Sequence, residues 1–132
     1  MPIETFVVYQ KAFDFFIWQK SVVKHLAKVH KYSLGVQIEN EALALLKNII
    51  VANMARPLSP TAQAVGGQAR TGKGKEIERC LVSLEMLKVL FRAGYELNRD
   101  GGINLKQYEA SSEKLVELGN LCGGWLKRFP AN

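Results

Sequence analysis

The chain has 132 residues, of which 48% are hydrophobic and 23% are charged, and it carries a formal net charge of +6. This length and composition predict one folded domain with its own core and exclude a largely disordered chain. The excess of 18 Lys and Arg over 12 Asp and Glu favours an acidic partner, above all nucleic acid.

The N-terminal segment is MPIETFVVYQ, in which Glu4 stands where a secretory signal carries positive charge. Apolar runs throughout the sequence are shorter than a membrane span. We therefore expect a cytoplasmic protein that has no membrane partner.

The first half of the chain has the pattern of two amphipathic helices. Proline occurs only near the two ends and in the centre, and apolar residues between these points recur at steps of three and four. The spacing predicts a first helix from about Ile3 to His30. A second helix is expected to start with Ser33 as its N-cap and to reach about Ala55. The segment from Arg56 to Gly74, rich in proline, glycine and small polar residues, predicts a flexible linker.

Two further helices are predicted after the linker. The third runs from about Lys75 to Asn98 and is stopped by the sequence RDGG. The fourth begins at Asn104, where Gln107 three residues later completes a variant of the capping box. Cys80 and Cys122 fall within the apolar patterns, so we expect two buried thiols. Four long helices with mostly short connections predict an all-α, antiparallel up-down four-helix bundle.

Three glycines interrupt the apolar pattern of the fourth helix, and each costs about 1 kcal/mol relative to alanine in a helix interior. Gly119 and Gly123 are four residues apart and share one helical face, and Gly124 precedes Trp125. A face without side chains lets another helix approach closely, which predicts close helix packing here. The alternative is a glycine hinge within the helix.

Basic residues recur at helical spacing in the first and third helices. Those of the first helix step by four, four and three, which predicts a basic stripe. Others crowd the positive N-terminal end of the third helix, where acidic residues are preferred, and this placement favours a binding role. The alternative is that these are solvated helix faces. The predicted nucleic-acid contacts are Lys20, Lys24, Lys28, Lys31, Lys73, Lys75, Arg79, Lys88, Arg92 and Arg99.

Three large apolar residues of the first helix lie outside its buried row. Phe6, Phe13 and Ile17 fall on the side that carries the lysines, where a monomer leaves them in water. Their position predicts an oligomer interface. The alternative is that the bundle itself buries both sides of this helix.

Sequence motifs for catalysis are incomplete. The stretch GQARTGKG, from Gly67 to Gly74, has the spacing of a phosphate-binding loop, but Gly74 replaces the Ser or Thr that holds magnesium and a helix precedes it in place of a strand. His25 and His30 are five residues apart, so they cannot share a metal as an i, i+4 pair does. We therefore expect no enzymatic activity, cofactor, metal or small-molecule substrate.

Three segments carry a family resemblance: YSLGVQIENEALALL, LEMLKVLFRAGYEL and LKQYEASSEKLVELGNLCGGWLK. They resemble the accessory variability determinant proteins of diversity-generating retroelements. These share motifs with the four-helix-bundle proteins encoded by intervening sequences of bacterial large ribosomal RNA. The resemblance covers most of the chain apart from the linker, which is longer and richer in glycine than the family leads us to expect.

The resemblance implies a nonenzymatic protein that forms a homopentamer of four-helix bundles and associates with a retroelement reverse transcriptase and its template RNA. The basic pair of the family matches Lys88 and Arg92, and its glycine–tryptophan pair matches Gly124 and Trp125. The alternative that the resemblance leaves open is an intervening-sequence-type bundle with a structural or ribosome-associated role. A neighbouring reverse-transcriptase gene with template and variable repeats would separate the two.

Overall fold

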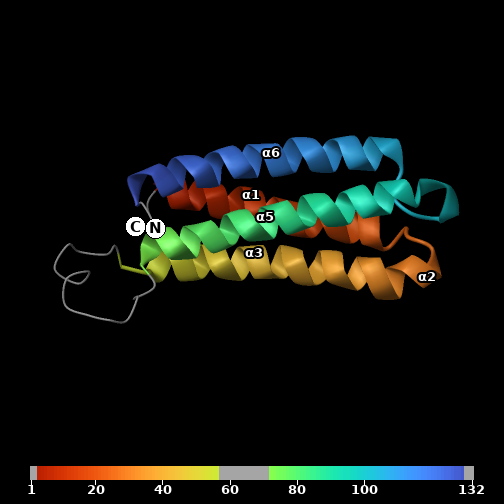
Figure 1. The fold of residues 1–132 in the computed structure, drawn as a ribbon, viewed down its shortest axis with the longest axis horizontal. Helices are drawn as coiled ribbons and strands as arrows, with labels where there is room; N and C mark the ends of the chain where they lie inside the picture. The colour runs from red at the N-terminus through yellow and green to blue at the C-terminus, as the bar shows by residue number, and fades with distance from the viewer. Residues whose placement is uncertain (1–2, 57–71, 130–132) are drawn as a thin grey trace.

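The computed structural model describes residues 3–56 and 72–129. Within these residues four long helices lie side by side as a bundle, and no strand is present (Figure 1). The all-α class predicted from the sequence is confirmed. Most of the predicted linker, residues 57–71, lies outside the described residues.

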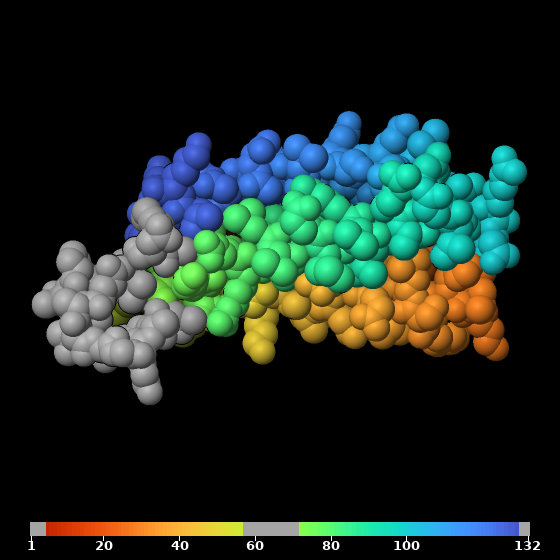
Figure 2. Space-filling view, in the orientation of Figure 1, coloured from red at the N-terminus to blue at the C-terminus, as the bar shows by residue number. Residues whose placement is uncertain are grey.

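The four long helices are α1 (Ile3–Val23), α3 (Val36–Met54), α5 (Lys73–Glu96) and α6 (Leu105–Arg128). α3 packs against both α1 and α5, and α6 packs against α5 and less extensively against α1. Figure 2 shows one face of the molecule covered by α3, α5 and α6, and Figure 1 shows α1 behind them. Each helix thus has two neighbours and one outer face.

The core is mostly apolar, with Gln19 and Ser111 among its few buried polar residues, and each long helix contributes a buried row at helical spacing. The Phe15 ring of α1 packs edge-on against Phe91 of α5, with 5.8 Å between the ring centroids, and Trp18 stacks on the same Phe91 ring at 5.8 Å. These contacts join two helices that are not direct neighbours. Other fully buried residues are Ile38, Leu45, Ile49, Ile77, Leu84, Leu87, Leu115 and Leu118.

The first helix is shorter than the sequence predicted. α1 ends at Val23, and the backbone is extended at Ala27, with φ −57° and ψ 149°. A new helical stretch then starts with α2 (Lys28–His30) and continues through a π-helical turn, η1 (Lys31–Gly35), into α3. The break accompanies a long-range contact, because the Ala27 amide donates to the Gly101 carbonyl at 2.8 Å.

Ser33 was predicted to cap the second helix, and this prediction is wrong. The residue lies inside the π-helical turn, and its hydroxyl donates to the Val29 carbonyl at 3.0 Å. The cap predicted at Asn104 is confirmed. Its side chain accepts from the Gln107 amide at 2.8 Å, and the Gln107 side chain accepts from the Asn104 amide at 3.0 Å. This reciprocal pair fixes the start of α6.

Close packing at the glycines of α6 was also predicted, and within the chain this prediction is wrong. A Cβ atom added at Gly119, Gly123 or Gly124 meets nothing within 4 Å. Trp125, by contrast, is buried in the core. As far as the described residues show, the three glycines leave part of the α6 surface bare, and none of the described helices packs there to offset their low helix propensity.

Both cysteines are buried, as predicted. Burial raises the pKa of Cys122 to about 12. Burial also raises the pKa of Cys80, and the nearby Cys122 and Glu76 add to this shift. Because an ionised thiol is poorly solvated in an apolar core, both groups stay protonated in the folded chain well beyond their ordinary range.

We expect the free energy of unfolding to fall as the pH rises above about 9, the ordinary pKa of these thiols. The unfolded chain then releases protons that the folded chain keeps, which costs about 1.4 kcal/mol per pH unit for each thiol. Urea titrations between pH 8 and 11 measure the slope. In the double variant Cys80→Ala and Cys122→Ala the thiol contribution should vanish, and an unchanged slope would contradict the assignment.

Candidate nucleic-acid interface

Lys88 and Arg92, the basic pair implied by the family resemblance, lie on α5 and each contacts an acidic residue one turn away. Lys88 Nζ is 3.0 Å from Glu85 Oε1, and Arg92 Nε is 2.7 Å from Glu96 Oε1. Hydrogen bonding with Glu96, and then with Tyr108 of α6, raises the pKa of Arg92. Exposed pairs of this kind contribute little to stability, so a phosphate group can replace the carboxylate.

Lys75 and Arg79, near the start of α5, are paired in the same way. Lys75 Nζ lies 3.8 Å from Glu78 Oε2, and Arg79 Nη1 lies 3.3 Å from Glu76 Oε2. The Glu76 carboxylate is buried, so Arg79 neutralises a charge that has little access to water. The acids one turn away reduce the net charge of α5, and the spacing of the cations along each face did not reveal them.

Lys73 has a structural role that was not predicted. Its ammonium donates to the carbonyls of Ala52 and Asn53 at 2.9 Å each, and these carbonyls belong to the last turn of α3. The ammonium also lies over the rings of Trp125 and Phe129 at 6.0 and 5.5 Å. Desolvation by burial lowers its pKa. Lys73 thus joins three helices, and we leave it out of the proposed nucleic-acid surface.

The lysine stripe predicted on the first helix is divided by the break after Val23. Lys20 lies on α1 and pairs with Glu39 of α3 at 3.1 Å. Lys24 lies in the turn that follows α1, and Lys28 and Lys31 lie beyond the break in α2 and η1. The prediction of four lysines on one helical face is therefore wrong. Three of them gather instead at one end of the bundle.

This end of the bundle, which we term the basic end, consists of residues 24–36 and 97–106. The first segment joins α1 to α3 and the second joins α5 to α6. Together they contain five Lys or Arg residues and a single acid, Asp100, for a net charge of +4. Within the described residues, none of these five cations makes an ion pair. They are Lys24, Lys28, Lys31, Arg99 and Lys106.

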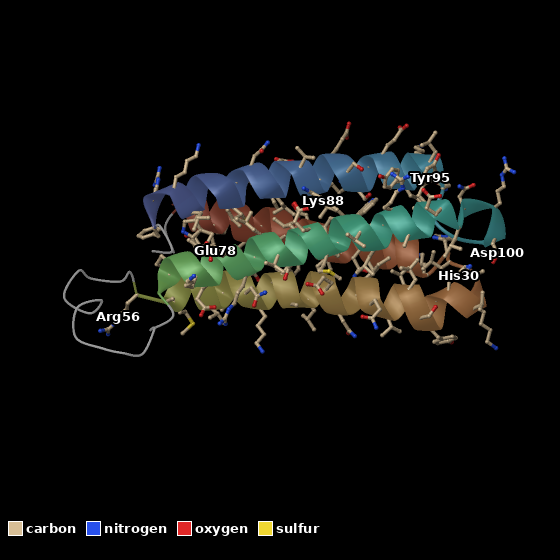
Figure 3. The ribbon with its side chains drawn as sticks, in the orientation of Figure 1. His30, Arg56, Glu78, Lys88, Tyr95 and Asp100 are labelled. Atoms are coloured by element: carbon tan, nitrogen blue, oxygen red, sulfur yellow. The ribbon has the colours of Figure 1, made fainter. Side chains whose placement is uncertain are left out.

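The two segments of the basic end are fastened to each other. His30 donates from Nε2 to the Asp100 carbonyl at 3.0 Å, and the same atom lies 3.4 Å from the Asp100 carboxylate (Figure 3). The bond from Ala27 to Gly101 lies beside this contact. Gly101 has φ +81°, and a Cβ atom there would collide with Ala27. The basic end is therefore a built structure in which glycine is required.

Tyr32 projects from the basic end, and the sequence analysis did not single it out. It sits in the π-helical turn η1 with 71% of its surface exposed. Among the described residues its ring has no aromatic partner and its hydroxyl has no hydrogen-bond partner. Lys28 precedes it by four residues, which places the two on the same side. The available signal was a tyrosine preceded by two lysines in the sequence KVHKYS.

The prediction that Phe6, Phe13 and Ile17 are exposed in a single chain is confirmed. The alternative, burial by the bundle itself, is wrong for this chain, since Phe6 alone is 54% exposed. These residues follow one another at steps of seven and four, so they form one row on α1.

A matching row on α3 was not predicted. Leu43, Ile50 and Met54 also follow at steps of seven and four, with exposed fractions of 55%, 44% and 76%. The chain turns back between α1 and α3 (Figure 1), and Lys20 is level with Glu39, so Ile17 and Leu43 lie at similar heights along neighbouring helices. We term the six residues the apolar face: Phe6, Phe13, Ile17, Leu43, Ile50 and Met54.

Comparison of the chain with protein-family models, curated proteins and solved structures gave no match. Within residues 3–56 and 72–129, no group of three or more His, Cys, Asp or Glu side chains is placed to hold a metal ion. In the same part of the chain, no helix has the length and apolar character that crossing a membrane requires.

Proposed function

We propose that this protein is a nonenzymatic accessory subunit of a diversity-generating retroelement. In the cytoplasm it associates with the reverse transcriptase and the template RNA and supports mutagenic synthesis of cDNA. The observation that carries the RNA partner is the basic end, which contains five cations and one acid, and none of these cations makes an ion pair within the described residues. Such a surface attracts the phosphate backbone of a nucleic acid. The retroelement itself enters through the resemblance of the helical segments.

Assembly is the second part of the proposal. The unit is an antiparallel up-down four-helix bundle that associates through the apolar face into a ring, and the resemblance favours five subunits. Six large apolar side chains along two neighbouring helices are typical of a surface that another subunit covers. A ring repeats the basic end once per subunit, and linked copies bind a long RNA more tightly than one copy does.

The genomic neighbourhood tests the context of the proposal. A nearby reverse-transcriptase gene with template and variable repeats would support the retroelement role. A position inside a ribosomal RNA gene would select the intervening-sequence class instead, and the basic end would then serve ribosomal RNA.

Lys88→Ala combined with Arg92→Ala is expected to weaken binding to structured template RNA and to the complex of reverse transcriptase and RNA. Removing two phosphate contacts should also make the dependence of affinity on salt less steep. The melting temperature and the oligomeric state should not change, because exposed ion pairs contribute little to stability. Fluorescence anisotropy at several salt concentrations measures the binding.

Lys127→Ala is the matched control, since Lys127 is exposed on α6, outside the apolar face, and makes no ion pair within the described residues. It should bind RNA as the parent does. If the double variant also binds RNA and supports cDNA synthesis like the parent, the α5 surface is only solvated and the residue-level support from the resemblance is lost.

A further inference from the structure

The shape of the basic end carries information about the kind of nucleic acid that it can bind. It combines its cations with an exposed aromatic ring, because Lys28 and Lys31 precede Tyr32 by four residues and by one, and Tyr32 is 71% exposed. An exposed aromatic ring without a partner in the described part of the chain is free to stack on a flat ligand group, and burying it there is favourable.

The backbone under Tyr32 is unusual. Residues 31–35 form a π-helical turn, a geometry that is rare and is found frequently at functional sites. Gly35 closes the turn against α1, because a Cβ atom there would lie 2.9 Å from Val23 Cγ1. On the other side, His30 is bound to Asp100. The turn is therefore held in place before any ligand arrives, which lowers the entropic cost of binding.

Charge decides between a nucleic acid and a second copy of the chain as the covering group. Two basic ends, each with a net charge of +4, repel each other when they face directly. A polyanion is attracted by the same cations. The apolar face on α1 and α3 is the surface suited to a second copy, and it lacks such an excess of positive charge.

Exposure of the ring decides between paired and unpaired strands. In an RNA duplex the bases are stacked on each other and offer no free face to a protein side chain, so duplexes are recognised through phosphates and 2′-hydroxyls. Unpaired bases do offer a free face, and proteins stack them on Tyr, Phe or Trp next to Lys and Arg that contact phosphates. Tyr32 with Lys28 and Lys31 has the composition of a site for unpaired bases.

We propose that the basic end binds an unpaired stretch of RNA, with one base stacked on Tyr32 and the adjacent phosphates held by Lys28 and Lys31. This inference rests on the proposed function, because it specifies which form of RNA the protein binds. Arg99 and Lys106, from the segment between α5 and α6, extend the positive surface for the rest of the strand.

The test uses the full chain and two labelled probes in fluorescence anisotropy at several salt concentrations, and the two probes are compared at the same salt. One probe is a single-stranded RNA of about 12 nucleotides, within the usual range of such sites, with a mixed sequence that cannot pair with itself. The other is the same strand annealed to its complement. Tyr32→Ala should weaken binding of the single strand roughly fivefold to a hundredfold, the range for loss of one stacked base. Binding of the duplex should change less than twofold.

Two further variants separate the ring from the charge. Tyr32→Phe keeps the stacking surface and should bind the single strand within about twofold of the parent. Lys28→Ala with Lys31→Ala should weaken binding of both probes and lower the slope of log affinity against log salt by about 1.4 for the single strand. Lys127→Ala again serves as the charge control. All variants should keep the parent's melting temperature and molar mass.

The outcomes distinguish this inference from the function on which it rests. If the parent binds neither probe, both are overturned. If the parent binds RNA and Tyr32→Ala binds the single strand equally well, the inference is overturned while RNA binding stands. A fall in molar mass for Tyr32→Ala would place the ring in a subunit interface and would also overturn the inference.

Discussion

Phe13→Asp is expected to convert the assembled protein into monomers that keep their helical content. The side chain lies in the centre of the α1 row and is 40% exposed in the single chain, so a carboxylate there is solvated in the monomer. In an assembly it would be buried without a partner, which costs several kcal/mol per subunit. Light scattering on the purified protein measures the molar mass, and circular dichroism measures the helical content.

Leu43→Asp should have the same effect, because Leu43 lies in the matching row of α3 and belongs to the same apolar face. Val116→Asp is the control, since Val116 is 52% exposed on α6 and lies outside that face. It should leave the molar mass unchanged. A parent protein that is monomeric at micromolar concentration would contradict the proposed assembly, and loss of helical content in Phe13→Asp would place Phe13 in the bundle core.

Gly102→Ala should lower the free energy of unfolding by about 3 kcal/mol, at the upper end of the usual cost of overpacking. The added Cβ atom would collide with the backbone carbonyl of Gly94 and with the backbone of Leu97. Rotation of a side chain cannot relieve a collision with backbone, so the turn between α5 and α6 has to shift. Urea denaturation followed by circular dichroism measures the change.

Gly119→Ala and Gly123→Ala are the matched controls, because the same atom added at these positions meets open space. Each should raise the free energy of unfolding by about 1 kcal/mol through higher helix propensity. If Gly123→Ala instead destabilises the protein, another subunit packs against the bare surface of α6. If Gly102→Ala has the same free energy of unfolding as the parent, the close contact between Gly102 and Gly94 is contradicted.

Features of the fold that depend on residues close together in the sequence were predictable. The start of α6 is an example, since Asn104 and Gln107 satisfy each other's amides across three residues. The break after Val23 depends instead on Gly101, which is more than seventy positions away and bonds to Ala27. Helical periodicity continues through His30 in the sequence, so no local signal marked the end of α1.

The candidate site was predicted only in part, because the sequence pattern does not reveal contacts between distant parts of the chain. Periodicity was sufficient to place Phe6, Phe13 and Ile17 in water, because it separates the two sides of one helix. It does not show which residues of different helices are neighbours, so the row of α3 beside them was missed. Lys24 and Arg99 come together only because two connections meet at one end of the bundle. Counting charges along single helices cannot reveal that.

The contact between His30 and Asp100 closes a loop of seventy residues that contains α3 and α5. Closing a long loop costs chain entropy, so this contact is expected to form after the neighbouring helices have paired. It is also among the first to open in the native state, since it relies on a few partly exposed hydrogen bonds. The Ala27 amide, bonded to Gly101, should therefore exchange its proton with solvent faster than amides at the centre of the bundle, and RNA bound at the basic end should slow that exchange.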